Sequence, residues 1–193
     1  MNFQPKGSEF LFMLLFRILL VIMWISFLVI GIRFFRMRPE QLEFWEKLPR
    51  NRAAGGILGL IALLAFIPNV KPLFSPEQNL WWLIPAAFIL AALCYFYLDH
   101  LLARAAAGCV ILLSHWMLNQ SFNADLPGSP FFAAMCLIGG TYAIFIAAKP
   151  YWLRDSFRAM CARPLWRIAG GGFMILWSLS AAILQFQAWS LGK

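Results

Sequence analysis

Long apolar runs alternate with short polar or basic segments along the whole chain. Six of these runs approach or exceed the roughly 20 residues that a helix needs to cross a bilayer. We expect helices over residues 10–32, 53–68, 75–97, 104–118, 129–148 and 165–191, with an irregular extension of the second to residue 74. The pattern predicts an all-α polytopic membrane protein with six transmembrane helices.

The first run contains one charged residue, Arg17. The run is longer than the roughly 7–15 residues of a signal-peptide core, and no small-residue cleavage site follows it, so we interpret it as a transmembrane helix. Arg17 lies about two turns from its start. Its side chain either extends to the nearer membrane interface or serves as a buried partner for a carboxylate or a ligand.

Two basic segments, residues 33–52 and 149–167, connect apolar runs. In the first, Leu42, Trp45 and Leu48 recur at helical spacing, which predicts a short amphipathic helix. This helix either lies in the membrane interface with Trp45 at headgroup level or packs against the soluble face of a partner. Serine followed by proline at Ser75 and at Ser129 is typical of a helix start.

The same basic segments set the expected topology. Cytoplasmic connections carry an excess of lysine and arginine, and an even number of spans places both termini on one side. The connection from Asp99 to Arg104 falls on the side of the two basic segments. We therefore expect both termini to be non-cytoplasmic.

A short phrase appears three times where an apolar run begins. It starts with Arg52, Arg104 and Arg167, and each arginine is followed by one residue, then Ala, a small residue and Gly. We expect these arginines at an interface with lipid or a partner, and we expect close helix packing at Gly55, Gly59, Gly108, Gly170 and Gly171. The phrases suggest three helical hairpins, approximately residues 10–74, 75–126 and 127–193, related as a parallel repeat. Chance similarity among Ala/Gly-rich helices is the alternative.

Composition supports a membrane protein. The chain of 193 residues is 62% hydrophobic and 12% charged, whereas soluble domains carry about 25% charged residues. We expect one transmembrane domain over residues 1–193. The net charge of +8 resides mostly in the two basic segments, which suits anionic lipid headgroups, and no nucleic-acid recognition motif accompanies it. The four cysteines show neither metal-ligand nor disulfide-framework spacing.

Few residues suggest chemistry. His115 and Asn119 form a polar patch within a span, which makes His115 a candidate haem ligand or a hydrogen-bonded packing residue. His100 lies near the opposite interface, so the two histidines would not share one iron. Asp99, His100 and Arg104 form either a proton-handling cluster or a solvated turn. The serines have no Gly-x-Ser-x-Gly context, which disfavours a hydrolase.

Residues 149–184 resemble a family of small two-helix bacterial inner-membrane proteins of uncharacterised function. The resemblance is carried by a loose pattern of prolines, glycines and single residues, namely Pro150, Trp152, Pro164, Arg167, Gly170 and Gly171. It implies no chemistry. It implies a multi-pass protein of the bacterial cytoplasmic membrane.

These observations predict a non-catalytic membrane subunit, a scaffold or anchor within a larger complex, whose partners are membrane lipid and other membrane-protein subunits. The first alternative is a transporter or substrate-binding component for a small, largely apolar molecule, which would use Arg17, His115, Asn119 and the Gly-rich helix ends. The second alternative is an electron-transfer subunit with haem on His115. We expect no cofactor, no metal site and no bound nucleic acid for the leading function.

Overall fold

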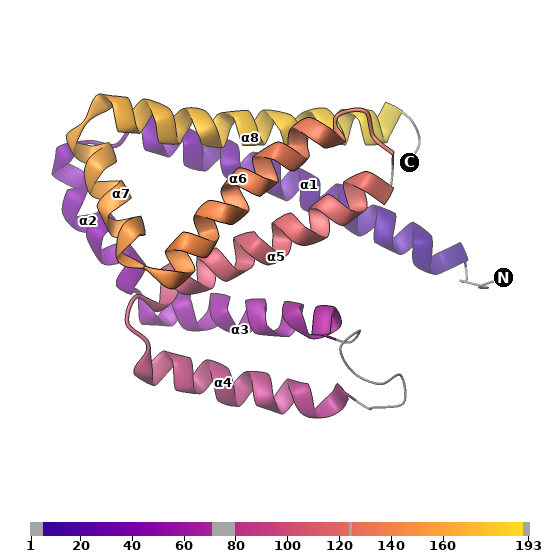
Figure 1. Ribbon diagram of the computed structural model, residues 1–193, viewed down its shortest axis with the longest axis horizontal. Coiled ribbons are helices and arrows are strands. Elements are labelled where there is room, and N and C mark those ends of the chain that lie inside the picture. The colour runs from indigo at the N-terminus through magenta and orange to yellow at the C-terminus, as the bar shows by residue number, and fades with distance from the viewer. Residues whose placement is uncertain (1–5, 71–79, 124, 191–193) are drawn as a thin grey trace. The chain divides into compact units, whose positions relative to one another are not determined.

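A computed structural model describes residues 6–70, 80–123 and 125–190, and every regular element in those residues is a helix (Figure 1). This confirms the predicted all-α class. The α-helices are α1 (Lys6–Phe35), α2 (Leu42–Lys47), α3 (Arg52–Val70), α4 (Leu83–Tyr97), α5 (Leu101–Asn123), α6 (Ser129–Ala148), α7 (Tyr151–Ala162) and α8 (Pro164–Ser190). Short 3₁₀ turns occupy η1 (Pro39–Gln41), η2 (Leu48–Arg50) and η4 (Leu80–Trp82).

Most predicted helices are present, with shifted ends. Helix α6 has the predicted bounds, but α5 begins three residues earlier and ends five residues later than the expected run over 104–118. At the polar end of α5 the Ser121 hydroxyl donates to the Leu118 carbonyl oxygen within the helix. The helix start expected at Ser75 lies outside the described residues.

Helix α7 corrects the sequence prediction, which treated residues 149–167 only as a basic connection. Phe157, Met160 and Cys161 are buried, while Arg158 on the opposite face is exposed. Buried positions three and four residues apart form one apolar stripe of a helix. The segment is therefore a 12-residue amphipathic helix.

Four helices in the described part of the chain are long and apolar enough to cross a membrane: α1 from Phe16 onward, α5, α6 and α8. Helix α3 with the preceding segment Pro39–Arg50 forms a bent pair, with a bend of 49°, that adds a fifth candidate. Helix α4 is apolar but has only 15 residues. The apolar helices thus indicate a multi-pass membrane protein with four to five candidate spans, and the predicted number of six stays a prediction.

The chain divides into two compact units. Unit 1 comprises residues 1–37, 114–138 and 163–193, and unit 2 comprises residues 38–113 and 139–162. Helices α5 and α6 each contribute one half to each unit. The described residues of each unit are considered separately below.

In unit 1, α1 and α8 lie side by side and run antiparallel (Figure 1). Rising residue numbers on α1 meet falling numbers on α8. The Gly31 carbonyl oxygen faces Gly171, and the Ser178 hydroxyl donates to the Trp24 carbonyl at 2.7 Å. Glycines let two backbones approach closely, and a serine bond across the pair satisfies its polar group inside an apolar environment. This pairing joins the first and last spans, which the three-hairpin arrangement assigns to different hairpins.

In unit 2, α3 packs against α4 and against the first half of α5. A Cβ at Gly55 would lie 2.5 Å from the Leu102 nitrogen, and one at Gly59 would lie 3.7 Å from the Ala105 Cβ. These contacts show that α3 and α5 run in the same direction from a common end. The Gly55-xxx-Gly59 spacing thus faces α5, where the missing side chains leave room for its backbone.

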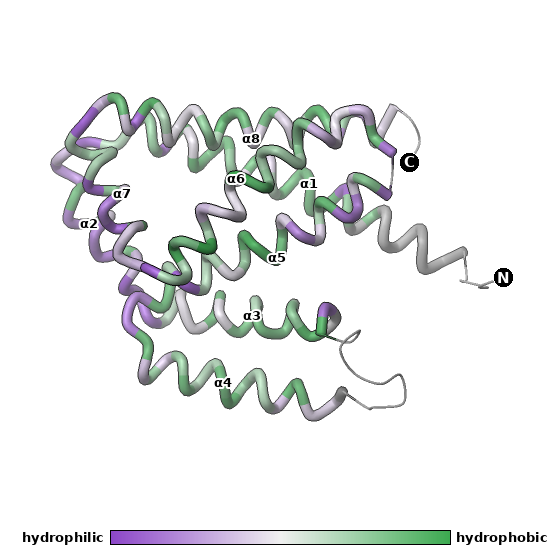
Figure 2. The backbone as a smooth tube through the Cα atoms, viewed as in Figure 1, coloured by the Kyte–Doolittle hydropathy of each residue, from purple (hydrophilic) through white to green (hydrophobic). Residues whose placement is uncertain are grey.

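The core of unit 2 continues between α5 and α6. Ala103 and Ala107 of α5 are buried against Ala143 and Ile146 of α6, and Leu153 of α7 packs on this group. The short alanine side chains allow close helix approach. Hydrophilic residues concentrate in α2 and α7, whereas α3 and α4 are apolar over most of their length (Figure 2).

Candidate functional site

The polar end of unit 2 centres on the turn between α4 and α5. Helix α4 ends at Tyr97 and α5 begins at Leu101, so Asp99 and His100 form the tight connection that the sequence predicts. His100 has φ 55°, in the left-handed region that non-glycine residues seldom adopt. Arg52, at the start of α3, reaches this turn, and its Nη2 lies 3.9 Å from Asp99 Oδ1.

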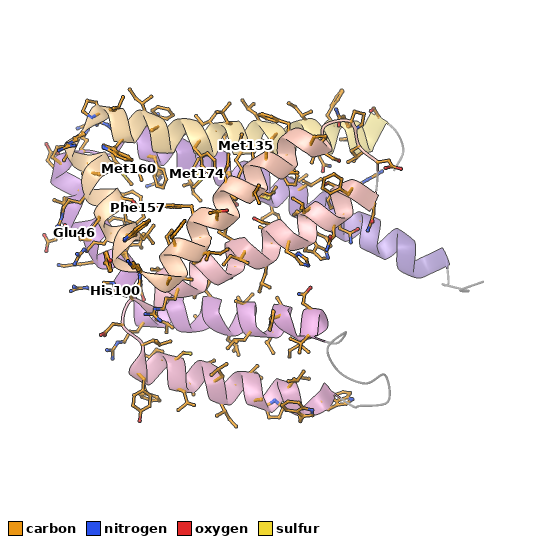
Figure 3. All side chains as sticks on the ribbon, in the orientation of Figure 1. Glu46, His100, Met135, Phe157, Met160 and Met174 are labelled. Carbon is orange, nitrogen blue, oxygen red and sulfur yellow. The ribbon has the colours of Figure 1, made fainter. Side chains whose placement is uncertain are left out.

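Several charged side chains act electrostatically on the ring of His100, which is labelled in Figure 3. We call this group the His100 cluster. It comprises Arg50 of η2, Arg52 of α3, Asp99 and His100 of the α4–α5 connection, Arg104 of α5 and Arg154 of α7. Two of its nitrogens, His100 Nδ1 and Arg104 Nε, are buried and have no hydrogen-bond partner among the described residues.

The surroundings of His100 disfavour a positive charge on its ring. Burial lowers the pKa of His100, and the positive charges of Arg50, Arg154 and Arg104 lower it further, while Asp99 opposes them. Since the ordinary pKa of histidine is about 6.5, His100 is neutral at pH 7. A neutral ring has one nitrogen that accepts and one that donates a hydrogen bond.

This pKa shift predicts a loss of stability in mild acid. The pKa of His100 is lower in the folded protein than in the unfolded chain. As pH falls below about 6.5, the unfolded chain therefore binds a proton at His100 before the folded protein does, and this uptake lowers the free energy of unfolding. We expect the Tm in mild detergent to fall between pH 7.5 and pH 5.5, and to fall less for His100→Asn. Asparagine is chosen because it tolerates the left-handed conformation.

The matched control for this titration is His115→Gln, which removes the other histidine. It should leave the acid dependence of Tm close to that of the unmodified chain. Equal pH profiles for His100→Asn and the unmodified chain would contradict the assignment of the acid effect to His100.

Beside the cluster, α2 packs on α7. The rings of Trp45 and Phe157 lie 5.3 Å apart, and Arg158 Nη2 lies 2.7 Å from Glu46 Oε1 (Figure 3). The sequence predicts α2 as an amphipathic helix that meets either the membrane interface or a partner. In the structure Trp45 of this helix meets α7 of the same chain.

Arg17 contacts the far end of α8. Its Nη2 donates to the Ala188 carbonyl oxygen at 3.1 Å. The last carbonyls of a helix have no partner within the helix, and a cation there also interacts favourably with the helix dipole. This bond is to a backbone carbonyl, and it ties the first turn of the α1 span to the last turn of α8.

His115 and Asn119 lie one turn apart on α5 within unit 1. Asn119 Nδ2 and His115 Nε2 are 3.3 Å apart, and both side chains are exposed. The structure thus brings these two predicted residues together as a hydrogen-bonded pair. Among the described residues no three histidine, cysteine or acidic side chains gather where they could hold a metal ion.

The remaining predicted positions divide between helix contacts and open surface. Arg167 Nη1 donates to the Met37 carbonyl oxygen at 2.7 Å and so joins the start of α8 to the end of α1. Gly171 makes the close approach to α1, while its neighbour Gly170 is half-buried. At Gly108 no atom lies within 4 Å of a Cβ position, so the close contact expected there is not seen among the described residues.

The serine and cysteine side chains are used in local structure. The hydroxyls of Ser121, Ser129 and Ser180 each donate to a backbone carbonyl oxygen, and Ser121 and Ser180 donate within their own helices. Cys94, Cys109 and Cys136 carry free thiols. Cys109 Sγ lies 3.7 Å from the Leu58 carbonyl oxygen, at the contact between α5 and α3.

Sequence reasoning did not predict the participation of Arg50 and Arg154 in one cluster with His100. The signal for α7 was present, since Leu153, Phe157 and Met160 recur at helical spacing. That periodicity places Arg154 on a helix, but the packing of α7 beside the α4–α5 turn depends on contacts between distant segments.

Comparisons with protein-family models, with curated proteins and with solved structures each found no match to the chain. The resemblance of residues 149–184 to a two-helix inner-membrane family therefore stays an expectation.

Proposed function

We propose that this chain is a non-catalytic subunit of a membrane complex, in which α4 packs against a transmembrane helix of a second membrane protein. In this proposal the chain acts as a scaffold or anchor, and it works without a cofactor. Its membrane is the bacterial cytoplasmic membrane, as the resemblance of residues 149–184 implies. Lipid surrounds the remaining apolar faces.

The observation that carries the proposal is the surface of α4. Ala87 is the one buried residue of this helix, and large apolar side chains are exposed around its circumference, including Phe88, Ile89, Leu93 and Phe96. At 1.5 Å per residue, 15 residues extend about 22 Å, which is shorter than a hydrocarbon core of about 30 Å. Short apolar helices relieve this mismatch by oligomerising or by thinning the bilayer.

A second line of support is the use of polar groups inside the described spans. Arg17, Ser178 and Ser180 all donate to backbone carbonyl oxygens, and His115 is paired with Asn119. Such bonds position helices against one another or satisfy polar groups locally in an apolar environment. This usage favours a structural role over the transporter alternative, which would need these side chains to meet a substrate.

The proposal includes a topology of six spans, α1, α3, α4, α5, α6 and α8, with both termini on the non-cytoplasmic side. Single cysteines at Asp125 and Asp155, in a background without the native cysteines, would report it through labelling by a membrane-impermeant reagent. Labelling of intact cells should occur at position 125 and not at position 155. Equal external labelling at both would contradict the six-span topology.

Site-specific photo-crosslinking tests the assembly. A benzophenone amino acid at Ile89 of α4 should give an adduct of one defined mass with a second membrane protein. Without crosslinking, the same protein should co-purify with the chain in mild detergent. The matched control is Leu137 of α6, whose side chain is also exposed. It should give no such adduct.

Several outcomes would contradict the proposal. An adduct of twice the chain mass of 22.0 kDa would assign the α4 surface to self-association. A stable monomer without an adduct would favour a single-chain function, and ligand-dependent melting of that monomer would then favour the transporter. A visible haem spectrum would favour the electron-transfer alternative.

A further inference from the structure

Four arginines gather where α1 ends and α8 begins, at one end of the antiparallel helix pair of unit 1 (Figure 1). Arg167 Nη1 donates to the carbonyl oxygen of Met37 at 2.7 Å. Next to Met37 in the chain, Arg36 donates its backbone N–H to the Arg33 carbonyl oxygen, and the backbone N–H of Arg167 donates to the Arg163 carbonyl oxygen. All four arginines therefore lie within about one helical turn of the contact between the two helices. We call Arg33, Arg36, Arg163 and Arg167 the arginine group.

No nearby carboxylate balances the arginine group. Every ion pair among the described residues lies in unit 2, namely Lys47–Glu43, Arg52–Asp99, Arg154–Asp155 and Arg158–Glu46. The sequence of unit 1 contains two acidic residues, Glu9 and Asp125. Both belong to the opposite end of the α1–α8 pair, as the next paragraph shows. The arginine group therefore carries an excess of positive charge, unlike the paired charges of α2 and α7.

The distance of the two acids follows from helix geometry. Glu9 lies 24 residues before Arg33 on α1, which corresponds to about 36 Å along the helix. Asp125 lies three residues before Gly128, whose backbone N–H donates to Gln187 Oε1 of α8 at 2.9 Å. Gln187 is 20 residues from the arginine group, about 30 Å along α8. Charges so far apart are largely screened at physiological salt.

Helix electrostatics explain only half of the arginine group. Arg33 and Arg36 lie at the end of α1, where the helix dipole favours cations. Arg163 and Arg167 lie at the start of α8, where the dipole disfavours them, and the first turn of this helix contains no acidic residue. The two arginines of α8 thus do not stabilise their helix through its dipole.

The arginine group is accessible at a membrane boundary. Arg33, Arg36 and Arg163 are exposed. Trp166 is exposed beside them, and tryptophan is enriched at the level of lipid headgroups. Helices α1 and α8 are both long and apolar enough to cross a membrane. Their common end is therefore where lipid headgroups meet the protein.

We propose that the arginine group binds the headgroup of an anionic phospholipid. Guanidinium groups match phosphate oxygens with two parallel N–H donors. Arg33, Arg36 and Arg163 donate to the headgroup, while Arg167 holds the two helix ends together through its bond to Met37.

The apolar surface beside the arginine group favours a lipid over a soluble anion. Val29, one turn before Arg33 on α1, and Ile168, next to Arg167 on α8, are exposed. Acyl chains can lie against these side chains while the headgroup meets the arginines. The inference requires no protein partner, so it stands apart from the function proposed above.

Lipid retention tests the inference on the full chain. The protein, purified in mild detergent, would be equilibrated with equal amounts of phosphatidylglycerol and phosphatidylcholine, and the bound lipids would be counted by native mass spectrometry. Phosphatidylglycerol should be retained in preference. Arg33→Gln and Arg163→Gln should each weaken its binding about fivefold, as expected for the loss of one cation beside an anionic headgroup.

Lys47→Gln is the charge-matched control, because it removes one positive charge from an exposed side chain that pairs with Glu43. It should retain phosphatidylglycerol like the unmodified chain. Arg167 is left unchanged because of its bond to Met37. Melting temperatures would verify that each variant is folded, and Arg36→Gln, also at an exposed position, replaces a variant that is not.

Three outcomes would overturn the inference. Equal retention of phosphatidylglycerol and phosphatidylcholine would show that the headgroup charge is not recognised. Equal weakening by the arginine variants and by Lys47→Gln would assign the preference to the net charge of the chain. Displacement of the lipid by an equimolar amount of inorganic phosphate would assign the arginine group to a soluble anion.

Discussion

Replacement of Trp177 by alanine is expected to lower the free energy of unfolding by about 3 kcal/mol, which is typical of removing a buried tryptophan. Trp177 is 2% exposed. Its ring lies 4.5 Å from that of Phe27 on α1 and 5.5 Å from that of Phe173 on α8. The substitution leaves a cavity in the α1–α8 contact, and close packing is the main attraction between helices in lipid.

Unfolding in a titration of SDS against mild detergent measures this effect. Trp189→Ala is the matched control on the same helix, because Trp189 is 75% exposed. It should change stability little. Trp177→Phe should cost less than Trp177→Ala, since it keeps most of the aromatic volume and leaves a smaller cavity. Equal effects at Trp177 and Trp189 would contradict the packing of α1 on α8.

Replacement of Gly55 by alanine is expected to destabilise the protein by about 1–3 kcal/mol, the usual cost of overpacking. The added Cβ would lie 2.5 Å from the Leu102 nitrogen and 2.9 Å from the Leu101 carbonyl carbon. Both are backbone atoms, which cannot move aside as the end of a flexible side chain can. The α3–α5 contact must therefore open.

Gly108→Ala is the matched control for Gly55→Ala, because a Cβ there meets no atom within 4 Å. Alanine is the better helix former, so this change should raise stability by up to about 1 kcal/mol. The melting temperatures of the two variants in mild detergent should move in opposite directions. A stable Gly55→Ala variant would contradict the close approach of α3 to α5.

The His100 cluster could be predicted from the sequence only in part. Asp99, His100 and Arg104 are close along the chain, and a polar turn between two apolar runs places them together wherever the helices pack. Arg50 and Arg154 lie about 50 residues away on either side of this turn. Their approach depends on the packing of η2 and α7, which local periodicity does not encode.

The intramembrane candidates show the same division. A lone arginine in the first apolar run indicates a need for a partner or for the interface, but its acceptor at Ala188 lies 171 residues further along the chain. His115 and Asn119, in contrast, are four residues apart, and helical geometry alone makes them neighbours.

The sequence by itself determined the helices, because apolar runs of membrane length leave the backbone no other way to satisfy its hydrogen bonds in lipid. It also determined the turn at His100 and the small residues that allow close packing. Only the tertiary structure decided that α1 pairs with α8, that Gly171 makes this contact, and that α7 packs on α2. The physical reason is that small residues permit many contacts between apolar helices, and the choice among them depends on the fit of side chains far apart in the sequence.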